Sequence, residues 1–426
     1  MRILWITSRL LPDACRAMGW GEDVVGGWMQ SQLNALLRTY GNVHEYLILS
    51  SDRRRCDITI GNVRHRSFGE GNRTYGRRVP AKVEAEARSV ISSFDPDVIH
   101  IHGTEFFYGR MSPDVYCGKP VVVSLQGILQ GYLPYVCGAL SRGEVFWQQF
   151  NIRRFLFGST MFNEQSFWRD NRVPQEELVF KTHRCFMGRT TWDRAWTKAL
   201  NPVARYFHVN ETLRDFFYSG DRRSQTAIRP HSIYCSAAAG YPLKGAHILL
   251  RAIAYLKEKY PDISLRICAA ERVTRPGSLI SLLKADQYTS YLRCLVRDLG
   301  IRPNIVGLPR LTADMVAEEL SRAEIFVLPS FCENSPNSLG EAQLVETPAI
   351  ATFVGGTSSL LRDGVDGRLV PPGDPATLAD MIDWYFAHPE DARKYAVAAR
   401  EQALVRHDPR LNAEATMKTY EELVKS

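Results

Sequence analysis

Short apolar runs alternate with amphipathic stretches along the first half of the chain. The runs at 2–8, 97–103 and 120–127 are almost continuously apolar and end in small or polar residues. Strands that are buried on both faces of a parallel sheet have this pattern. A stretch that begins near Trp28 instead has its apolar residues at helical spacing. The alternation predicts strand–helix units built on a parallel sheet.

A second alternating series fills the rest of the chain. Its apolar runs include 231–237 and 323–330, and the charged, turn-rich stretch 219–230 separates it from the first series. The length of 426 residues suits two or three domains. We therefore expect two α/β domains in tandem, 1–225 and 226–405.

Composition restricts the cellular setting. No run of about 18 uncharged apolar residues exists, and the start, with Arg2, lacks the apolar core and cleavage site of a signal peptide. The nine cysteines are scattered, odd in number and without a C-x-x-C pair. This pattern favours reduced thiols in the cytoplasm, and argues against a disulfide framework or a zinc site.

Positive charge is concentrated in the first half. Residues 1–225 contain 30 Lys and Arg against 22 Asp and Glu, in a chain of net charge +7. Such a surface suits anionic lipid headgroups, a phosphorylated acceptor or nucleic acid, or it is simply solvated. No RNA- or DNA-binding motif supports nucleic acid. The aromatic stretch 145–170, with Arg153 and Arg154, suits either a membrane surface or core helices of the first domain.

The stretch 330–352, SFCENSPNSLGEAQLVETPAIAT, contains two glutamates eight residues apart. Ser335 is a good N-cap and Pro336 suits the first helical position, so we expect a helix from Pro336 to Glu346. Glu333 then lies in the loop before the helix, and Glu341 lies inside it. The unit is a βαβ crossover whose loop follows the carboxyl end of a strand, where doubly wound sheets bind ligands.

Longer motifs resemble the family-4 glycosyltransferases. They are LKGAHILLRAIAYL, IFVLPSFCENSPNSLGEAQLVETPAIAT, VGGTSSLLRDGVDGRLVPPGD and an early double glycine before a helix. The resemblance implies the α/β GT-B fold, with two Rossmann-like doubly wound domains facing across a cleft. Residues 1–225 would bind the acceptor and 226–405 the nucleotide-sugar, while a helix in 406–426 would pack back on the first domain.

The resemblance also implies roles for three charged residues. Glu341 matches the glutamate that accepts hydrogen bonds from the donor ribose, and Glu333 matches the one beside the transferred sugar. Lys244 matches the lysine that neutralises the departing diphosphate, a charge that these enzymes hold without a metal ion. We expect Glu333 and Lys244 to act in catalysis.

Further donor contacts are expected from glycine loops and from the start of the predicted helix. Glycines allow backbone N–H groups to approach a diphosphate closely, and the backbone at a helix start binds sugar hydroxyls or phosphate. The residues concerned are Gly26, Gly27, Gly355, Gly356, Ser335, Asn337 and Ser338.

The chain departs from the family pattern at three positions, one of which is Ser359, where the family often has a glutamate. Gln126 stands where many members have a histidine that touches the donor sugar, and glutamine cannot carry a proton. Ala238 stands where a phosphate-binding arginine is usual, so another arginine such as Arg189 would have to replace it.

Other candidates for the donor sugar or the acceptor lie in the first half. His102 ends an apolar strand, whereas His100, two residues earlier, is expected in the core. THRCFMGRTTWDRAW, at 182–196, resembles a bacterial subgroup of the family. Within it Arg189, Trp192 and Asp193 suit an acceptor site, with ordinary packing as the alternative.

The resemblance implies a retaining, metal-independent hexosyltransferase that needs no cofactor besides its UDP- or GDP-linked donor substrate. We expect a saccharide or lipid-linked saccharide acceptor, in bacterial surface polysaccharide synthesis, and a cytoplasmic protein at the inner face of the membrane. The alternatives are another GT-B sugar-nucleotide enzyme and a non-catalytic sugar-nucleotide-binding protein. A dehydrogenase is disfavoured because no G-x-G-x-x-G follows the first strand.

Overall fold

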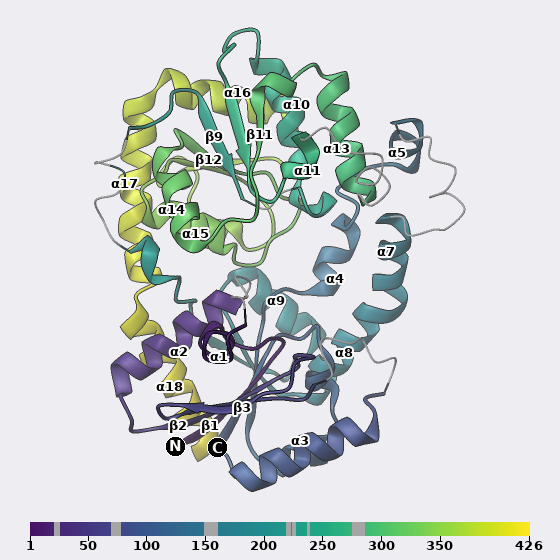
Figure 1. Ribbon diagram of the computed structural model, residues 1–426, viewed down its shortest axis with the longest axis vertical. Helices are drawn as coiled ribbons and strands as arrows, with labels where there is room; N and C mark the ends of the chain where they lie inside the picture. Colours follow the sequence, from purple (N-terminus) through teal and green to yellow (C-terminus); the bar gives the residue numbers. More distant parts are fainter. Residues whose placement is uncertain are drawn as a thin grey trace. The chain divides into compact units, whose positions relative to one another are not determined.

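The computed structural model describes residues 1–20, 26–69, 78–148, 161–218, 223, 227–236, 239–274 and 286–426. The chain divides into two compact α/β units, coloured along the sequence in Figure 1. Unit 1 comprises Met1–Gly131, Trp168–Arg214 and Arg406–Ser426. Unit 2 comprises Tyr132–Phe167 and Asp215–Val405.

Unit 1 is built on an eight-stranded sheet in the order β3-β4-β2-β1-β5-β6-β7-β8. Its strands are β1 (Arg2–Thr7), β2 (Glu45–Ser50), β3 (Asp57–Ile60), β4 (Val63–Ser67), β5 (Val98–His102), β6 (Val121–Ser124), β7 (Cys185–Gly188) and β8 (Arg205–His208). Edge strand β3 is antiparallel to β4, and the other pairs are parallel. The apolar runs predicted as strands are therefore β1, β5 and β6.

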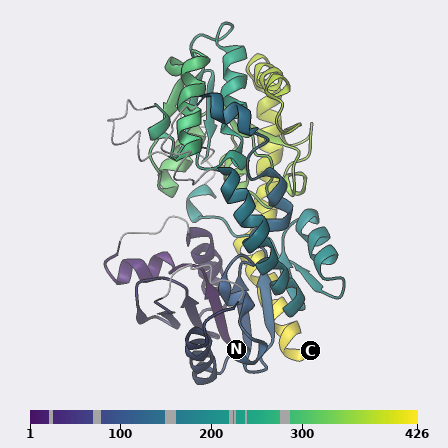
Figure 2. The same ribbon diagram turned by 90° about the vertical axis from the view of Figure 1, so that its right-hand side faces the viewer.

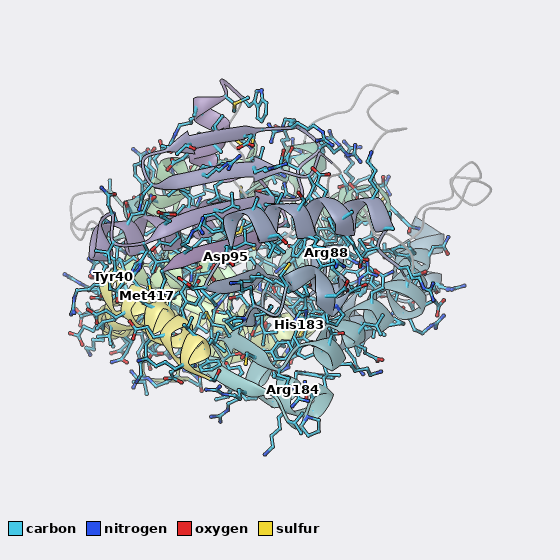
Figure 3. The ribbon with its side chains drawn as sticks, turned by 90° about the horizontal axis from the view of Figure 1, so that it is seen from below. Tyr40, Arg88, Asp95, His183, Arg184 and Met417 are labelled. Atoms are coloured by element: carbon cyan, nitrogen blue, oxygen red, sulfur yellow. The ribbon has the colours of Figure 1, made fainter. Side chains whose placement is uncertain are left out.

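Helices accompany this sheet, and one of them comes from the far end of the chain. They are α1 (Pro12–Ala17), α2 (Gly27–Tyr40), α3 (Ala81–Phe94), α4 (Leu129–Tyr132), α8 (Val173–Thr182), α9 (Thr191–Leu200) and α18 (Pro409–Lys425), with a π-helical turn at Trp168–Arg172. The last helix, α18, packs against α2, and Figure 3 shows Met417 near Tyr40. The Tyr420 hydroxyl accepts a hydrogen bond from Trp5 Nε1 at 3.0 Å and lies 2.6 Å from His100 Nδ1. Residues 406–426 thus complete the core of unit 1.

Unit 2 is built on a six-stranded parallel sheet in the order β11-β10-β9-β12-β13-β14. Its strands are β9 (Ser232–Cys235), β10 (Ser264–Ile267), β11 (Ile305–Gly307), β12 (Ile325–Leu328), β13 (Ala349–Thr352) and β14 (Arg368–Val370). Its helices are α5 (Arg142–Gln148), α7 (Met161–Phe167), α10 (Ala246–Leu256), α11 (Glu271–Thr274), α13 (Gln287–Asp298), α14 (Ala313–Arg322), α15 (Asn337–Leu344), α16 (Pro375–Ala387) and α17 (Pro389–Arg406).

The segment 132–167 corrects the predicted domain boundary and the assignment of these helices to the first domain. Cys137, Leu140 and Met161 belong to the same buried apolar cluster as the strands of unit 2. The Met161 N–H donates to Gln287 Oε1 of α13 at 2.9 Å, and Figures 1 and 2 show helix α5 beside α13. Cys137, Leu140 and Met161 are therefore buried in the core of unit 2. Arg153 and Arg154 lie outside the described residues.

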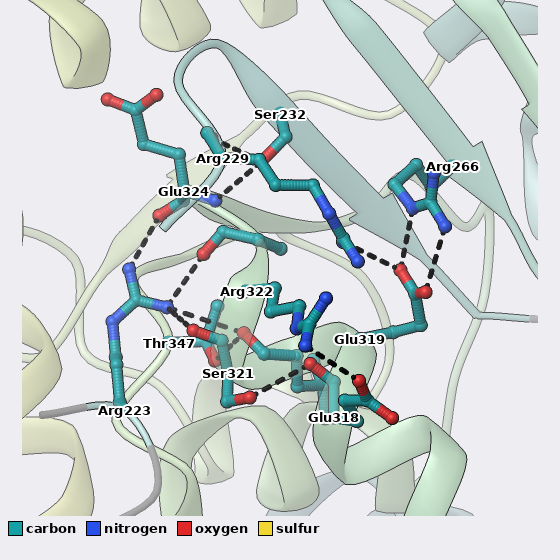
Figure 4. Close-up of polar contacts among 12 residues, drawn as sticks. Arg223, Arg229, Ser232, Arg266, Glu318, Glu319, Ser321, Arg322, Glu324 and Thr347 are labelled. Atoms are coloured by element: carbon teal, nitrogen blue, oxygen red, sulfur yellow. Dashed lines mark hydrogen bonds and ion pairs between the residues drawn. The ribbon is translucent and has the colours of Figure 1, made fainter. Parts of the chain in front are cut away.

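Arginines organise the amino ends of the unit 2 strands (Figure 4). Arg223 donates to the carbonyl oxygens of Ala323 at 2.6 Å and Glu324 at 3.2 Å, just ahead of β12. Burial lowers the pKa of Arg223 to about 10, so it remains charged at neutral pH. Glu319 of α14 accepts hydrogen bonds from Arg229 and Arg266. Arg223 also donates to the carbonyl oxygens of Leu320 and Ser321 in the last turn of α14, so these arginines hold the end of the helix against the sheet.

Within the described ranges, no helix is both long enough and apolar enough to cross a membrane.

Removing the Tyr420 hydroxyl should destabilise unit 1, because it leaves Trp5 Nε1 and His100 Nδ1 buried without that partner. We expect Tyr420→Phe to lower the free energy of unfolding by about 1–3 kcal/mol. Differential scanning calorimetry should show a lower Tm. Tyr255→Phe, at a 63% exposed tyrosine, is the matched control and should change it little. Equal Tm values for both variants would contradict the role given to Tyr420.

Candidate active site

Lys244 and Glu333, which the sequence predicts to act together, meet at the carboxyl edge of the unit 2 sheet. Lys244 ends a short 3-10 turn, Pro242–Lys244, that follows β9, and Glu333 lies in the loop after β12. The Lys244 Nζ donates to Glu333 Oε1 at 2.6 Å. The lysine side chain is 35% exposed, whereas that of Glu333 is 7% exposed. The site therefore places a partly exposed cation beside a buried carboxylate.

The two loops are locked together through their backbones. The Phe331 N–H donates to the Leu243 carbonyl oxygen at 2.8 Å. Gly245 has φ +73°, and a Cβ at this position would lie 1.9 Å from the Pro329 carbonyl oxygen. A side chain is therefore excluded there by both conformation and space. The distance between Lys244 and Glu333 follows from this close approach.

Ser330 is a site residue that the sequence interpretation missed. Its hydroxyl donates to Glu333 Oε1 at 2.7 Å, the oxygen that also accepts from Lys244. Thr352 at the end of β13 donates through Oγ1 to the Ser330 carbonyl oxygen at 2.5 Å. A serine just after a buried strand and three residues before the glutamate is the sequence signal for this contact.

A third loop, after β13, holds the Glu333 backbone. Gly355 has φ +49°, and a Cβ there would lie 1.9 Å from the Glu333 carbonyl oxygen. The Gly356 N–H donates to that same oxygen at 2.9 Å. This corrects the prediction that Gly356 offers its N–H to a donor, because the group is already used. Gly355 and Gly356 instead position the loop that carries Glu333.

The helix after Glu333 begins one residue later than predicted. Its first residue is Asn337, and Pro336, with ψ 109°, occupies the N-cap position that was expected for Ser335. No side chain caps the helix. Ser335, Asn337 and Ser338 are half-buried around its amino end, and Asn337 Oδ1 is buried without a partner among the described residues. The first N–H groups of a helix favour an anion.

Glu341 lies inside this helix and is 6% exposed. Glu341 interacts electrostatically with Tyr234 of β9. Burial, together with Cys268 and Glu341, raises the pKa of Tyr234 well above its usual range. The helix thus carries a second carboxylate on a rigid element in the unit that contains Lys244 and Glu333.

The remaining predicted residues belong to unit 1. Gly26 is the N-cap of α2 and Gly27 is its first residue. His102 ends β5, is 2% exposed and has no partner for either ring nitrogen among the described residues. Burial lowers its pKa well below the usual range, so the ring is neutral. Gln126 follows β6, and its Nε2 is also buried without a partner in the described part of the chain.

Arg189 is already neutralised within unit 1. Its guanidinium forms a buried ion pair with Glu211 and lies 5.7 Å from the centre of the Trp28 ring. An arginine held by a carboxylate in this way is poorly suited to replace the missing phosphate cation. Ala238, whose presence suggested that replacement, lies outside the described residues.

The buried position of Asp193 corrects its expected role with the acceptor, whereas the role of Trp192 stays a prediction. The Asp193 carboxylate is fully buried in a capping box with Thr190, and it accepts hydrogen bonds from the Arg189 N–H and the Tyr206 hydroxyl. Trp192 packs edge-on against Trp196 at 6.2 Å, beside the unit 1 core. The alternative of ordinary packing accounts for Asp193.

A buried pair of carboxyl groups, Glu105 and Glu176, was not predicted. Thr104 donates to Glu176 Oε1 at 2.6 Å. Burial, reinforced by the charge of Glu105, raises the pKa of Glu176 to about 8. Burial also raises the pKa of Glu105, whose Oε2 has no partner among the described residues. Sequence spacing could not reveal this pair, since its members lie on separate elements.

Comparison with known proteins gives these residues a context. Residues 221–402 match the family model described as glycosyl transferases group 1. The D-inositol 3-phosphate glycosyltransferase of Streptomyces coelicolor is 33% identical over 162 residues, 38% of this chain and 34% of that protein. The protein of the same name from Paenarthrobacter aurescens is 31% identical over 162 residues, 38% and 37% of the two chains. The chain thus matches about a third of the length of these relatives.

Solved structures resemble the chain over its whole length. Sucrose-phosphate synthase from Thermosynechococcus elongatus has a TM-score of 0.70 at 16% identity, covering 99% of both chains. Anabaena HepE, solved in complex with UDP and glucose, has a TM-score of 0.65 at 16% identity, also covering 99% of both. At this identity the likeness defines the fold, which is GT-B, as the sequence predicts.

Substituting Gly355 tests the close approach to Glu333. Gly364 is the matched control, because it also has a positive φ, +69°, but no atom lies within 4 Å of a Cβ there. Gly364→Ala should cost about 1–2 kcal/mol of backbone strain, and Gly355→Ala about 1–3 kcal/mol more. Urea unfolding of both variants measures the difference. Equal losses of unfolding free energy in the two variants would show that the loop carrying Glu333 can move to accept a Cβ at position 355.

The raised pKa of Glu176 predicts a pH-dependent stability. Above its ordinary pKa of 4.5 the unfolded chain loses the proton, whereas the folded chain keeps it up to about pH 8. Wild-type stability should therefore fall as the pH rises through this window, by at most about 1.4 kcal/mol per unit from this group. The glutamine of Glu176→Gln does not titrate, so the Tm of this variant relative to that of the wild type should increase from pH 5 to 8. Glu177→Gln on the same helix is the control, and parallel curves for Glu176→Gln and wild type would contradict the prediction.

Proposed function

We propose that this chain, whose residues 221–402 match the family model of group 1 glycosyl transferases and whose fold is GT-B, transfers a hexosyl group from a nucleotide-sugar to a saccharide hydroxyl. The observation that carries the proposal is the ion pair between Lys244 and Glu333 at 2.6 Å, in the unit that also holds Glu341. These three residues match the motifs through which the sequence resembles family-4 glycosyltransferases.

The chemistry of glycosyl transfer explains why a cation and a carboxylate should be neighbours. When the bond between the sugar and the diphosphate breaks, negative charge develops on the leaving oxygen and positive charge on the anomeric carbon. Lys244 stabilises the first charge and Glu333 the second, while the proton of the acceptor hydroxyl passes to the departing diphosphate oxygen as the new bond forms. We infer that transfer needs no metal ion, because Lys244 supplies the cation. We also propose retention, on the resemblance to family-4 glycosyltransferases alone.

Glu341 would bind the donor through its ribose. A carboxylate accepts hydrogen bonds from two neighbouring hydroxyls at once, and its place on a buried helix keeps it in position. The half-buried Ser335, Asn337 and Ser338 surround the amino end of the same helix, where the helix dipole favours the diphosphate. HepE was solved with UDP and glucose, which makes a UDP-hexose the first donor to test, ahead of a GDP-hexose.

The acceptor is proposed from the sequence resemblance and from the residues of unit 1. The resemblance of 182–196 to a bacterial subgroup supports a saccharide or lipid-linked saccharide, and a role in surface polysaccharide synthesis at the cytoplasmic face of the membrane. We place acceptor binding in unit 1, where His102 and Gln126 have buried polar atoms without partners among the described residues. The relatives named for inositol phosphate make a phosphorylated polyol the second acceptor class to test.

A non-catalytic sugar-nucleotide-binding protein is the second candidate. Gln126 favours it, because glutamine cannot carry a proton where many family members have histidine. Such a protein would bind the donor through Glu341 but would not turn it over.

Calorimetric titration of UDP-glucose and GDP-mannose, without metal, tests the donor site. Loss of the paired hydrogen bonds in Glu341→Ala should weaken binding about a hundredfold. Glu258→Ala, at an exposed glutamate of the same unit, is the control and should bind as the wild type does. Glu333→Gln should keep binding but lower the rate of transfer or donor hydrolysis about 10²–10³-fold.

The outcomes separate the candidates. If the wild type binds neither class of sugar nucleotide, both candidates are wrong. If it binds one class but neither transfers nor hydrolyses the sugar, the binding-protein alternative replaces the transferase.

A further inference from the structure

We propose that Ser330 is a positioning residue that holds the Glu333 carboxylate in place while Lys244 is engaged with the leaving diphosphate. This inference rests on the proposed function of the same site. It assigns a role to a residue that neither the sequence resemblance nor the comparisons single out.

Two donors share one oxygen of Glu333. Lys244 Nζ lies 2.6 Å and Ser330 Oγ 2.7 Å from Oε1. Among the described residues, no hydrogen bond reaches the second oxygen, Oε2. The carboxylate is therefore held through one oxygen and presents the other to a substrate.

The two donors differ in how firmly they are placed. Lys244 is 35% exposed at its side chain and lies on a flexible four-carbon stem. Ser330 is fully buried, and its backbone is fixed by the hydrogen bond from Thr352 Oγ1. When the lysine turns toward a diphosphate, its contact with Glu333 weakens, whereas the serine contact remains. Ser330 then supplies the hydrogen bond that keeps the carboxylate aligned with the anomeric carbon.

A second buried serine in the same sheet shows the ordinary alternative. The Ser232 hydroxyl, at the start of β9, donates to the backbone carbonyl oxygen of Arg229 at 2.6 Å (Figure 4). Ser330 instead donates to a charged side chain, a bond about twice as strong as a neutral one. Ser232 lies at the opposite edge of the sheet from Glu333, so it is a matched control for losing a buried hydroxyl.

The experiment compares Ser330→Ala, Ser330→Cys and Ser232→Ala with the wild type. Cysteine fills nearly the same space as serine but is a weak hydrogen-bond donor. We expect kcat to fall about tenfold in both Ser330 variants, the equivalent of one hydrogen bond to a charged group. The Kd for UDP, measured by calorimetry, should stay within about twofold, because the effect arises in the transfer step. Ser232→Ala should keep the wild-type kcat.

Several results would overturn the inference. One is a kcat of Ser330→Ala within about twofold of the wild type. Another is wild-type kcat in Ser330→Cys combined with a loss in Ser330→Ala, which would show that the serine only fills space. A loss of kcat matched by an equal weakening of UDP binding would place its effect on donor binding. Scanning calorimetry shows whether each variant is folded. If Ser330→Ala does not fold, the kcat of Ser330→Cys tests the inference in its place.

The test is distinct from that of the proposed function. Absence of transfer and hydrolysis in the wild type overturns the transferase itself, and this inference with it. Wild-type turnover with unaffected Ser330 variants overturns only the role of Ser330.

Discussion

The Glu333 backbone is the constraint on which the candidate site depends. Its carbonyl oxygen accepts the Gly356 N–H and lies where a side chain at Gly355 would have to be. A similar contact joins Gly245 to the Pro329 carbonyl oxygen, just ahead of the same loop. Three loops from separate strands thereby meet without side chains between them, and the position of Lys244 relative to Glu333 follows. The glycines are needed here for close approach, since rigid backbones place charged groups more reproducibly than side chains alone.

Much of the fold could be predicted because local periodicity reflects burial. Apolar runs identified strands such as β1 and β5, and alternation identified the parallel sheets. The resemblance to a known family predicted that Lys244 and Glu333 act in the same site. What local patterns could not determine was which sheet the segment 132–167 would join, because its apolar residues suit either core. The prediction that Ser335 is the N-cap was wrong because Pro336 adopts an extended ψ and occupies the N-cap position itself.

The remaining failures concern polar groups with partners that are remote in sequence. Asp193 and Arg189 have side chains that suit a sugar or a phosphate, but their charges are used within unit 1. Ser330 was missed for the opposite reason, as serine is common after strands and its value comes from the carboxylate it contacts. Polar residue types indicate what chemistry is available, whereas only the hydrogen-bond partners show whether that chemistry is still free.

The return of α18 to unit 1 has a consequence for protein synthesis. Trp5 and His100 are separated from Tyr420 by 415 and 320 residues. A ribosome therefore makes the first strands long before the helix that satisfies their buried nitrogens. Cys137, Leu140 and Met161 are likewise made before the strands of the core that they join. Neither unit can finish its core from a contiguous nascent segment, so final packing of both is delayed, and simple cuts between residues 1–225 and the remainder would leave two incomplete cores.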